Sequence, residues 1–221
     1  MFTDRKDAAL QLAKALERYR NKNAVVLGIP RGGAEIGYYV AIHLNAEFSL
    51  LVSRKLGHPD NPEYAFGAIA EDGSIYLSPY ARQDVSDDTI HESVEAQKLE
   101  IVRRVKVLRK GKPLPELKGR TVIIVDDGIA TGSTVFVAIE MCKKKDAREI
   151  VIAAPVSGDR MEEMLAKRID DVIILEKPFG FHSVSQVYKS FYNLTDAQVL
   201  NFMERWEDEQ TLFKDEDKKT P

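Results

Sequence analysis

Two adjacent carboxylates, Asp126 and Asp127, have the clearest chemical potential in this sequence. They directly follow five β-branched residues, 121–125, which predict a strand buried on both faces. A turn of small residues comes next, 128–134, and a helical pattern runs over 135–145. Free N–H groups in such a turn and at a helix start bind phosphate, and paired acids can hold sugar hydroxyls or a metal ion. The stretch therefore offers an anion site beside two acids.

The composition of the turn narrows the kind of anion site. The hydroxyls of Thr131, Ser133 and Thr134 add hydrogen-bond donors to it. A Walker P-loop is excluded, because that motif needs a lysine directly after its second glycine, whereas Gly132 is followed by Ser133. The alternative is an ordinary strand-to-helix turn with acidic ends. Two acids before T-G-S-T are rare enough to favour the ligand site.

Residues 125–134, V-D-D-G-I-A-T-G-S-T, resemble the phosphoribosyl-diphosphate (PRPP) motif of type I phosphoribosyltransferases, in which two acids and a T-G-x-T turn follow an apolar strand. The resemblance implies that Asp126 and Asp127 are catalytic and hold the ribose hydroxyls of PRPP, at an open strand end. They are also the expected ligands of Mg²⁺, directly or through water. The turn is expected to bind the 5′-phosphate through Ala130, Thr131, Gly132, Ser133 and Thr134.

Two further segments are expected to bind the pyrophosphate of PRPP. R-G-G at 31–33 follows the first apolar run, and glycines let the backbone approach a ligand closely. An Arg-Lys pair follows the next apolar run, as in adenine-type enzymes. By resemblance the pyrophosphate-binding residues are Arg31, Gly32, Gly33, Arg54 and Lys55, and Arg54 is also catalytic. The alternatives, an ordinary glycine turn and a solvated basic pair, stay open.

The segment 177–190 follows the last predicted strand, and in this family the corresponding loop covers the acceptor base. Phe181 and Tyr188 are expected to bind the acceptor by stacking, with Phe179 as a further candidate, although Phe181 and Tyr188 are equally compatible with core packing. Ala130 stands where enzymes for 6-oxopurines carry an aspartate. This departure argues against a 6-oxopurine acceptor and favours the adenine- or orotate-type pattern, without identifying the base.

Alternating strands and helices must position these residues. We expect strands at 24–29, 48–52, 121–125, 149–154 and 171–175, separated by helical segments. This order predicts an α/β fold with a doubly wound, mostly parallel five-stranded sheet, the fold of type I phosphoribosyltransferases. Ligands bind at the carboxyl ends of such strands, where the acids and the glycine turns lie.

A small hood and lid should complete one domain over 1–206. The lid is expected at about 54–80, where a proline-punctuated loop precedes a hairpin, and its closure would exclude water. The N-terminal helix, 4–20, is interpreted as a packing element and forms the hood together with 177–206. A long helix is predicted over 86–110, with its basic end explained by the helix dipole and a solvated face. The charged tail, 207–221, is expected to be frayed or disordered.

Composition sets the outer limits. Hydrophobic residues make up 44% and charged residues 30%, as in ordinary globular proteins. A net charge of -3 does not favour nucleic acid or a membrane surface as a partner. The single cysteine, Cys142, excludes an internal disulfide framework. Without a signal peptide or a membrane-spanning run, the expected location is the cytoplasm.

The resemblance implies an enzyme in which a nitrogen acceptor, expected to be a nucleobase, displaces pyrophosphate from PRPP in a Mg²⁺-dependent reaction. The expected partners are PRPP and a small-molecule acceptor, and we expect a homodimer. Two alternatives compete: a non-catalytic regulatory protein that senses PRPP or a nucleotide, and a generic nucleotide-binding module. A missing lid or a missing group of the Arg54 type would favour the regulatory protein. Such a protein would also be expected to carry an appended DNA-binding segment, and the sequence shows none.

Overall fold

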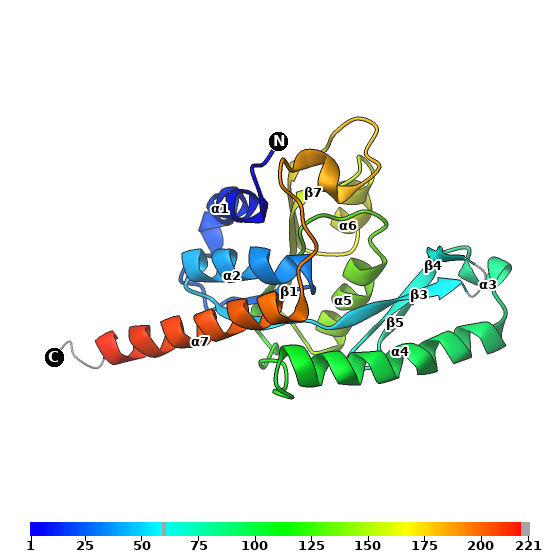
Figure 1. The fold of residues 1–221 in the computed structure, drawn as a ribbon, viewed down its shortest axis with the longest axis horizontal. Helices are drawn as coiled ribbons and strands as arrows, with labels where there is room; N and C mark the ends of the chain where they lie inside the picture. Colours follow the sequence, from blue (N-terminus) through cyan, green and yellow to red (C-terminus); the bar gives the residue numbers. More distant parts are fainter. Residues whose placement is uncertain (59–60, 218–221) are drawn as a thin grey trace.

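The computed structural model of the protein describes residues 1–58 and 61–217, with only the backbone considered over 61–64 and 211–217. Its centre is a five-stranded sheet in the order β2-β1-β6-β7-β8, in which every neighbouring pair runs parallel (Figure 1). The strands are β1 (Val25–Gly28), β2 (Glu47–Leu50), β6 (Thr121–Val125), β7 (Glu149–Val156) and β8 (Asp171–Glu176). The predicted sheet is confirmed, and β6 lies at its centre.

Helices cover both faces of this sheet, so it is doubly wound. On one face pack α1 (Arg5–Ala15), α2 (Gly32–Leu44) and α7 (Asp196–Asp217); on the other pack α5 (Ser133–Lys144) and α6 (Met161–Ala166). The predicted N-terminal helix ends early, and a 3₁₀ turn, η1 (Glu17–Tyr19), follows it. A second 3₁₀ turn, η2 (Val184–Val187), lies between β8 and α7. None of the helices in the described ranges combines the length and hydrophobicity needed to cross a membrane.

A separate three-stranded antiparallel sheet projects from the main body beside α5 (Figure 1). Its strands are β3 (Ser53–His58), β4 (Asn61–Ala70) and β5 (Ile75–Leu77). The predicted hairpin is confirmed, but the predicted loop before it is wrong from Asn61 onward, because β4 already begins there. Residues 59–60 lie outside the described part of the chain.

Helix α4 (Asp87–Leu108) covers this small sheet, after a short helix, α3 (Ala81–Asp84). Ser86 caps α4 by accepting a hydrogen bond from the Thr89 N–H. The long helix predicted over 86–110 is confirmed, and its residues Val94 and Ile101 are buried against the small sheet. The N-terminal helix and 177–206, the predicted hood, contribute buried residues to the main core instead. From here on the word hood denotes β3–β5 together with α3 and α4, the unit that contains the predicted lid.

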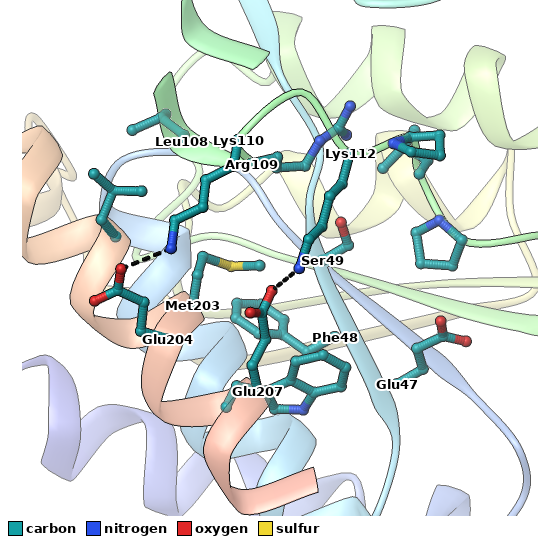
Figure 2. Close-up of a pocket in the computed structure, with 15 residues that line it drawn as sticks. Glu47, Phe48, Ser49, Leu108, Arg109, Lys110, Lys112, Met203, Glu204 and Glu207 are labelled. Carbon is teal, nitrogen blue, oxygen red and sulfur yellow. Dashed lines mark hydrogen bonds and ion pairs between the residues drawn. The ribbon is translucent and has the colours of Figure 1, made fainter. Parts of the chain in front are cut away.

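Helix α7 runs past residue 206, the predicted end of the domain. It continues to Asp217, so the expectation of a disordered tail is wrong for 207–217, while 218–221 lie outside the described residues. Trp206 packs edge-on against Phe48 of β2, and Glu207 accepts a hydrogen bond from Lys112 (Figure 2). Glu207, a charged residue of the predicted disordered tail, thus helps to attach α7 to the segment after α4.

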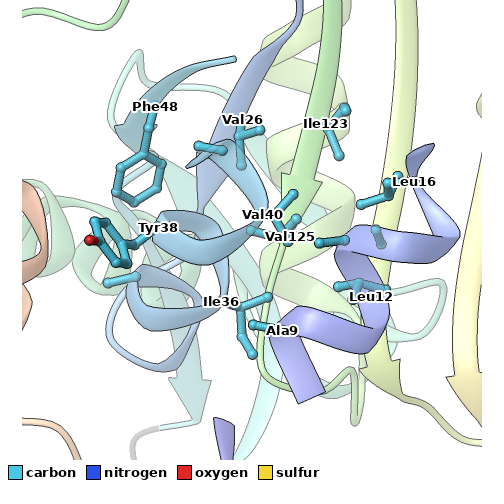
Figure 3. Packing of buried hydrophobic residues seen from close by; sticks show 14 of the residues in the cluster. Ala9, Leu12, Leu16, Val26, Ile36, Tyr38, Val40, Phe48, Ile123 and Val125 are labelled. Carbon is cyan, nitrogen blue, oxygen red and sulfur yellow. The ribbon is translucent and has the colours of Figure 1, made fainter. Parts of the chain in front are cut away.

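The main core lies between α1, α2 and β6 (Figure 3). Side chains of β6 alternate between the two faces, because successive residues of a strand point in opposite directions. Ile123 and Val125 pack with Leu12 on the α1 side, whereas Val122 and Ile124 pack on the α5 side. Burial of all five β6 residues leaves the polar groups of the next segment at the carboxyl edge of the sheet.

Candidate active site

The carboxyl end of β6 opens into a cavity of about 160 Å³. Three features converge on it: the first acid of the pair, the small-residue turn before α5, and a lysine from the hood. The lining residues are Lys55, Asp126, Gly128, Ile129, Ala130, Thr131, Gly132, Thr134, Val135 and Val184. The structure therefore brings together residues of β3, the β6–α5 turn and η2 that are far apart in the sequence.

The turn ends in a free helix N-terminus. Gly132 has a φ of 77°, a left-handed conformation that favours glycine, and α5 starts at the next residue. No side chain caps α5 by a hydrogen bond in the described structure, so the N–H groups of its first turn are available to a ligand. Ala130 and Thr131 are exposed, while Ser133 is buried. This geometry suits an anion at the predicted phosphate turn.

The two acids are packed more tightly than an open strand end. The Asp127 N–H donates a hydrogen bond of 2.8 Å to Asp126 Oδ1, and the Asp127 side chain is only 14% exposed. Burial raises the pKa of Asp126 well above its usual value, and the neighbouring charge of Asp127 raises it further. Burial also raises the pKa of Asp127, while a guanidinium, that of Arg5, opposes the shift. The expected open position is therefore wrong for Asp127, whereas Asp126 does line the cavity.

Arg5 was not predicted as a site residue. It lies on α1, is 4% exposed, and its Nε donates a hydrogen bond of 2.7 Å to Asp127 Oδ2. The sequence does contain a signal, because Arg5 is in helical register with Ala8, Ala9 and Leu12, all of which face the core. The interpretation of this helix as a packing element is thus incomplete.

The glycine loop after β1 lies directly against the acids. A Cβ on Gly32 would be 1.8 Å from Asp127 Oδ2, and one on Gly33 would be 2.6 Å from the Val125 carbonyl oxygen. The Pro30–Arg31 peptide bond is cis. A side chain at Gly33 would meet the backbone at the end of β6, and one at Gly32 would meet the Asp127 carboxylate, so the structure explains the R-G-G motif by close approach to the backbone and to the second acid.

Arg54 and Lys55 separate, because neighbours on a strand point to opposite faces. Lys55 lines the cavity with the phosphate turn. Arg54 instead reaches α4, where its Nε donates a hydrogen bond of 2.9 Å to Gln97 Oε1. The position of Lys55 is therefore compatible with the predicted pyrophosphate contact. The Arg54 side chain is bound to Gln97 and does not line the cavity.

Arg54 belongs to a cluster of four arginines between the hood and the glycine loop. Burial lowers the pKa of Arg54, and the positive charges of Arg104, Arg103 and Arg31 lower it further. Glu100 accepts hydrogen bonds from Arg103 and Arg104. The explanation of the basic end of α4 as a solvated face is therefore wrong for Arg104, which is largely buried.

The three candidate aromatic residues of 177–190 lie in different environments. Tyr188 is buried between Phe2 and Phe191, with ring centroids 5.5 and 5.0 Å away, and its hydroxyl donates to the Asp127 carbonyl oxygen at 2.7 Å. Its predicted stacking on the acceptor is therefore corrected to a core role, and burial raises its pKa. Phe181 is half-buried against the core, and its acceptor role stays a prediction. Phe179 is 97% exposed.

The same segment does reach the cavity, through a residue that was not predicted. Val184 lines it, and a Cβ on Gly128 would be 2.5 Å from Val184 Cγ1. A larger cavity, about 420 Å³, lies elsewhere, between α7, the edge of β2 and the segment after α4 (Figure 2). Because none of the predicted site residues lines that larger cavity, we place the candidate active site at the smaller one.

Comparison with known proteins gives a consistent family. The family model described as the phosphoribosyl transferase domain matches residues 4–189. A Mycobacterium tuberculosis protein that is provisionally named a phosphoribosyl transferase is 40% identical over 207 residues. The match covers 93% of this chain and 47% of that protein, so the chain spans about half the length of the curated relative.

A solved structure extends the similarity to the whole fold. The protein TT1426 from Thermus thermophilus is 35% identical, with a TM-score of 0.79, over 93% of this chain and 98% of that one. The purine phosphoribosyltransferase of Pyrococcus horikoshii is more distant, at 19% identity and a TM-score of 0.47 over 86% and 92% of the two chains. That similarity is too low to bear on the acceptor.

Proposed function

The chain belongs to the phosphoribosyltransferase family, and on that premise we propose that it transfers the ribose 5-phosphate of PRPP to a nitrogen acceptor of the nucleobase class, releasing pyrophosphate. One observation carries the proposal. Asp126 and Lys55 meet the free N-terminus of α5 around one cavity, and the glycine loop packs against the second acid. An acid, a cation and an anion-binding turn are the groups that a phosphorylated sugar with a pyrophosphate substituent requires.

The turn is proposed to bind the 5′-phosphate. Its backbone N–H groups over 130–134 and the dipole of α5 favour a doubly charged anion, and the Thr131 and Thr134 hydroxyls can add donors. Asp126 and Asp127 are proposed to accept hydrogen bonds from the ribose hydroxyls. Anchoring both ends of the sugar ring fixes the anomeric carbon relative to the acceptor, and such orientation is a major source of rate enhancement.

The departing pyrophosphate needs positive charge in the transition state. The ribose ring becomes oxocarbenium-like as the bond to the pyrophosphate oxygen breaks, and the acceptor nitrogen forms the new bond to the anomeric carbon. Lys55 in the cavity and Arg31 at the glycine loop are proposed to stabilise the negative charge that develops on the leaving group. Arg54, Arg103 and Arg104 extend this positive region toward α4.

The donor set fits a magnesium ion held partly by the substrate. The described residues form no group of three or more side chains that could hold a metal ion by themselves. Mg²⁺ is commonly bound by one or two carboxylates together with substrate phosphates, so Asp126 and Asp127 would suffice, directly or through water. When bound, the ion would supply positive charge next to the pyrophosphate.

The test is a two-part measurement. Calorimetric titration should show PRPP binding that depends on Mg²⁺, and a screen of nucleobases and other ring-nitrogen acceptors should find one that releases pyrophosphate from PRPP. Because Ala130 lines the cavity where 6-oxopurine enzymes carry an acid, we expect hypoxanthine and guanine to be poor acceptors. PRPP binding without turnover on any acceptor would favour a sensor. Absence of PRPP binding would overturn the proposed function.

A further inference from the structure

We propose that Arg5, on the N-terminal helix, is a positioning residue that holds the carboxylate of Asp127 in the orientation needed to bind the ribose. The inference rests on the proposed function and adds to it a residue from outside the PRPP motif. It assigns a role in sugar binding to α1, a helix that contributes none of the residues lining the cavity.

Arg5 is fixed on three sides. Its Nε donates to Asp127 Oδ2 at 2.7 Å, and its Nη1 donates to the Tyr192 carbonyl oxygen at 2.7 Å. Its guanidinium carbon lies 4.0 Å from the centroid of the Phe191 ring, which provides a cation–π contact. A guanidinium with these contacts and almost no exposure cannot swing into solvent without losing all of them.

Asp127 is in turn confined from other directions. The Tyr188 hydroxyl donates to its carbonyl oxygen at 2.7 Å, which holds the backbone. Gly32 lies directly against the carboxylate, so the side chain cannot move toward the glycine loop. The Tyr188 bond holds the backbone of Asp127, and Gly32 prevents the carboxylate from moving toward the glycine loop. The hydrogen bond from Arg5 therefore fixes the orientation of the carboxylate.

A neighbouring acid indicates that this choice of partner is specific. Glu35 on α2 is buried and lies near enough to Arg5 to interact with it electrostatically. Its Oε2 atom has no hydrogen-bond partner in the described structure. Arg5 therefore engages the acid of the site while a buried carboxylate nearby keeps an unsatisfied oxygen, an arrangement that a purely structural arginine would not need.

A comparison of two ligands separates positioning from simple stabilisation. PRPP needs Asp127 for its ribose, whereas inorganic phosphate needs only the turn at α5. We expect Arg5→Gln to weaken PRPP binding about 10-fold or more and to change phosphate binding by less than about 2-fold. Arg5→Lys should recover part of the PRPP affinity, because it keeps a buried cation. Lys14→Gln, an exposed charge change on the same helix, is the matched control and should bind both ligands like the wild type.

A double-mutant cycle tests whether Arg5 acts through Asp127. The combined variant Arg5→Gln/Asp127→Asn should bind PRPP no more weakly than Asp127→Asn alone, since the second change removes the group that the first one positions. Equal loss of PRPP and phosphate binding, or additive losses in the cycle, would overturn the proposal. If Arg5→Gln fails to melt cooperatively, Arg5→Lys replaces it in the cycle. Additive losses of PRPP affinity in that cycle would likewise overturn the proposal.

The same measurements separate this inference from the proposed function. If Asp127→Asn binds PRPP like the wild type, the sugar site itself is wrong. If Asp127→Asn is weakened but Arg5→Gln and Arg5→Lys bind like the wild type, the sugar site stands and only the role of Arg5 fails.

Discussion

The carboxyl edge of the main sheet and the hood both supply charged residues to the candidate site, but they hold them differently. At the sheet edge, Asp127 is confined by Arg5 of α1, by Tyr188 directly after η2 and by Gly32 at the start of α2. In the hood, Lys55 lies on β3, a strand of the small sheet, and lines the cavity. The small sheet packs with α4 in a hydrophobic cluster of its own. The acids proposed to bind the sugar are thus held by three separate segments of the main body, whereas the proposed cation Lys55 lies on a unit with its own core.

A buried clamp joins the hood to the main body. Arg109, at the end of α4, donates from Nη1 to the Leu50 carbonyl oxygen at 2.9 Å and to Glu71 Oε1 at 2.8 Å. Glu71 also accepts from the Val52 N–H at 2.9 Å, so the clamp holds the point where β2 passes into β3. The hood is thus attached to the main body where β2 passes into β3. The predicted closure of the lid stays a prediction for β3–β5.

The largest effect is expected from breaking that clamp. Arg109→Gln leaves Glu71 buried without its cation and should lower the free energy of unfolding by about 3–5 kcal/mol. The loss should be accompanied by faster amide exchange in β3–β5 than in β6 and β7. Chemical denaturation and hydrogen exchange measure both. Arg82→Gln, which breaks an exposed ion pair of the same hood, should cost less than about 1 kcal/mol. Uniform loss of protection in both sheets would contradict a hood that opens independently of the main sheet.

Removing both acids should abolish sugar binding at the sheet edge. Asp126→Asn/Asp127→Asn is expected to weaken PRPP binding by at least roughly 100-fold, because two charge-assisted hydrogen bonds are lost. Its melting temperature will reflect two opposing changes: relief of repulsion between the acids and loss of the Arg5 ion pair. Calorimetric titration with Mg²⁺ is the measurement. PRPP affinity equal to that of the wild type would show that the pair is structural.

A methyl group at the glycine loop should disturb the sheet edge by geometry alone. Gly32→Ala would place Cβ 1.8 Å from Asp127 Oδ2, so either the loop or the carboxylate must move. We expect PRPP affinity to fall roughly 10- to 100-fold, about 1.4–2.8 kcal/mol. Gly158→Ala is the matched control, since its Cβ would make only an ordinary contact of 3.4 Å with Phe181. Similar PRPP affinities for the two variants would mean that the glycine loop accommodates a methyl group without disturbing Asp127.

The smallest effect concerns the two neighbours on β3. Lys55→Gln should weaken PRPP or pyrophosphate binding by about 10-fold, because a charge-assisted contact in the cavity is lost. Arg54→Gln should weaken it by only about 2- to 3-fold, because its side chain is bound to Gln97. Titration of both variants with pyrophosphate decides. A larger loss for Arg54→Gln would restore the sequence-based assignment of Arg54 as the main contact.

The outcome for particular elements shows what sequence patterns can predict. The structure confirms the strand over 121–125, the turn between the acids and α5, and the long helix predicted over 86–110. Each of these features depends on neighbours within one element. The β-strand assignment failed at β3, whose sequence S-R-K-L-G-H lacks an apolar run and becomes a strand only by pairing with β4.

The sequence by itself determined the order of the strands in the main sheet, their parallel arrangement and the segment that carries the acids, because local periodicity and turn chemistry specify them. Only the tertiary structure decided which side chains the acids meet. Arg5 and Asp127 are 122 residues apart, and Tyr188 and Asp127 are 61 apart, so no local pattern links them. Likewise the burial of Tyr188 and the anchoring of α7 beyond Trp206 depend on packing between distant segments. Charged and aromatic side chains take their partners from the packed neighbours, and packing is a property of the whole fold.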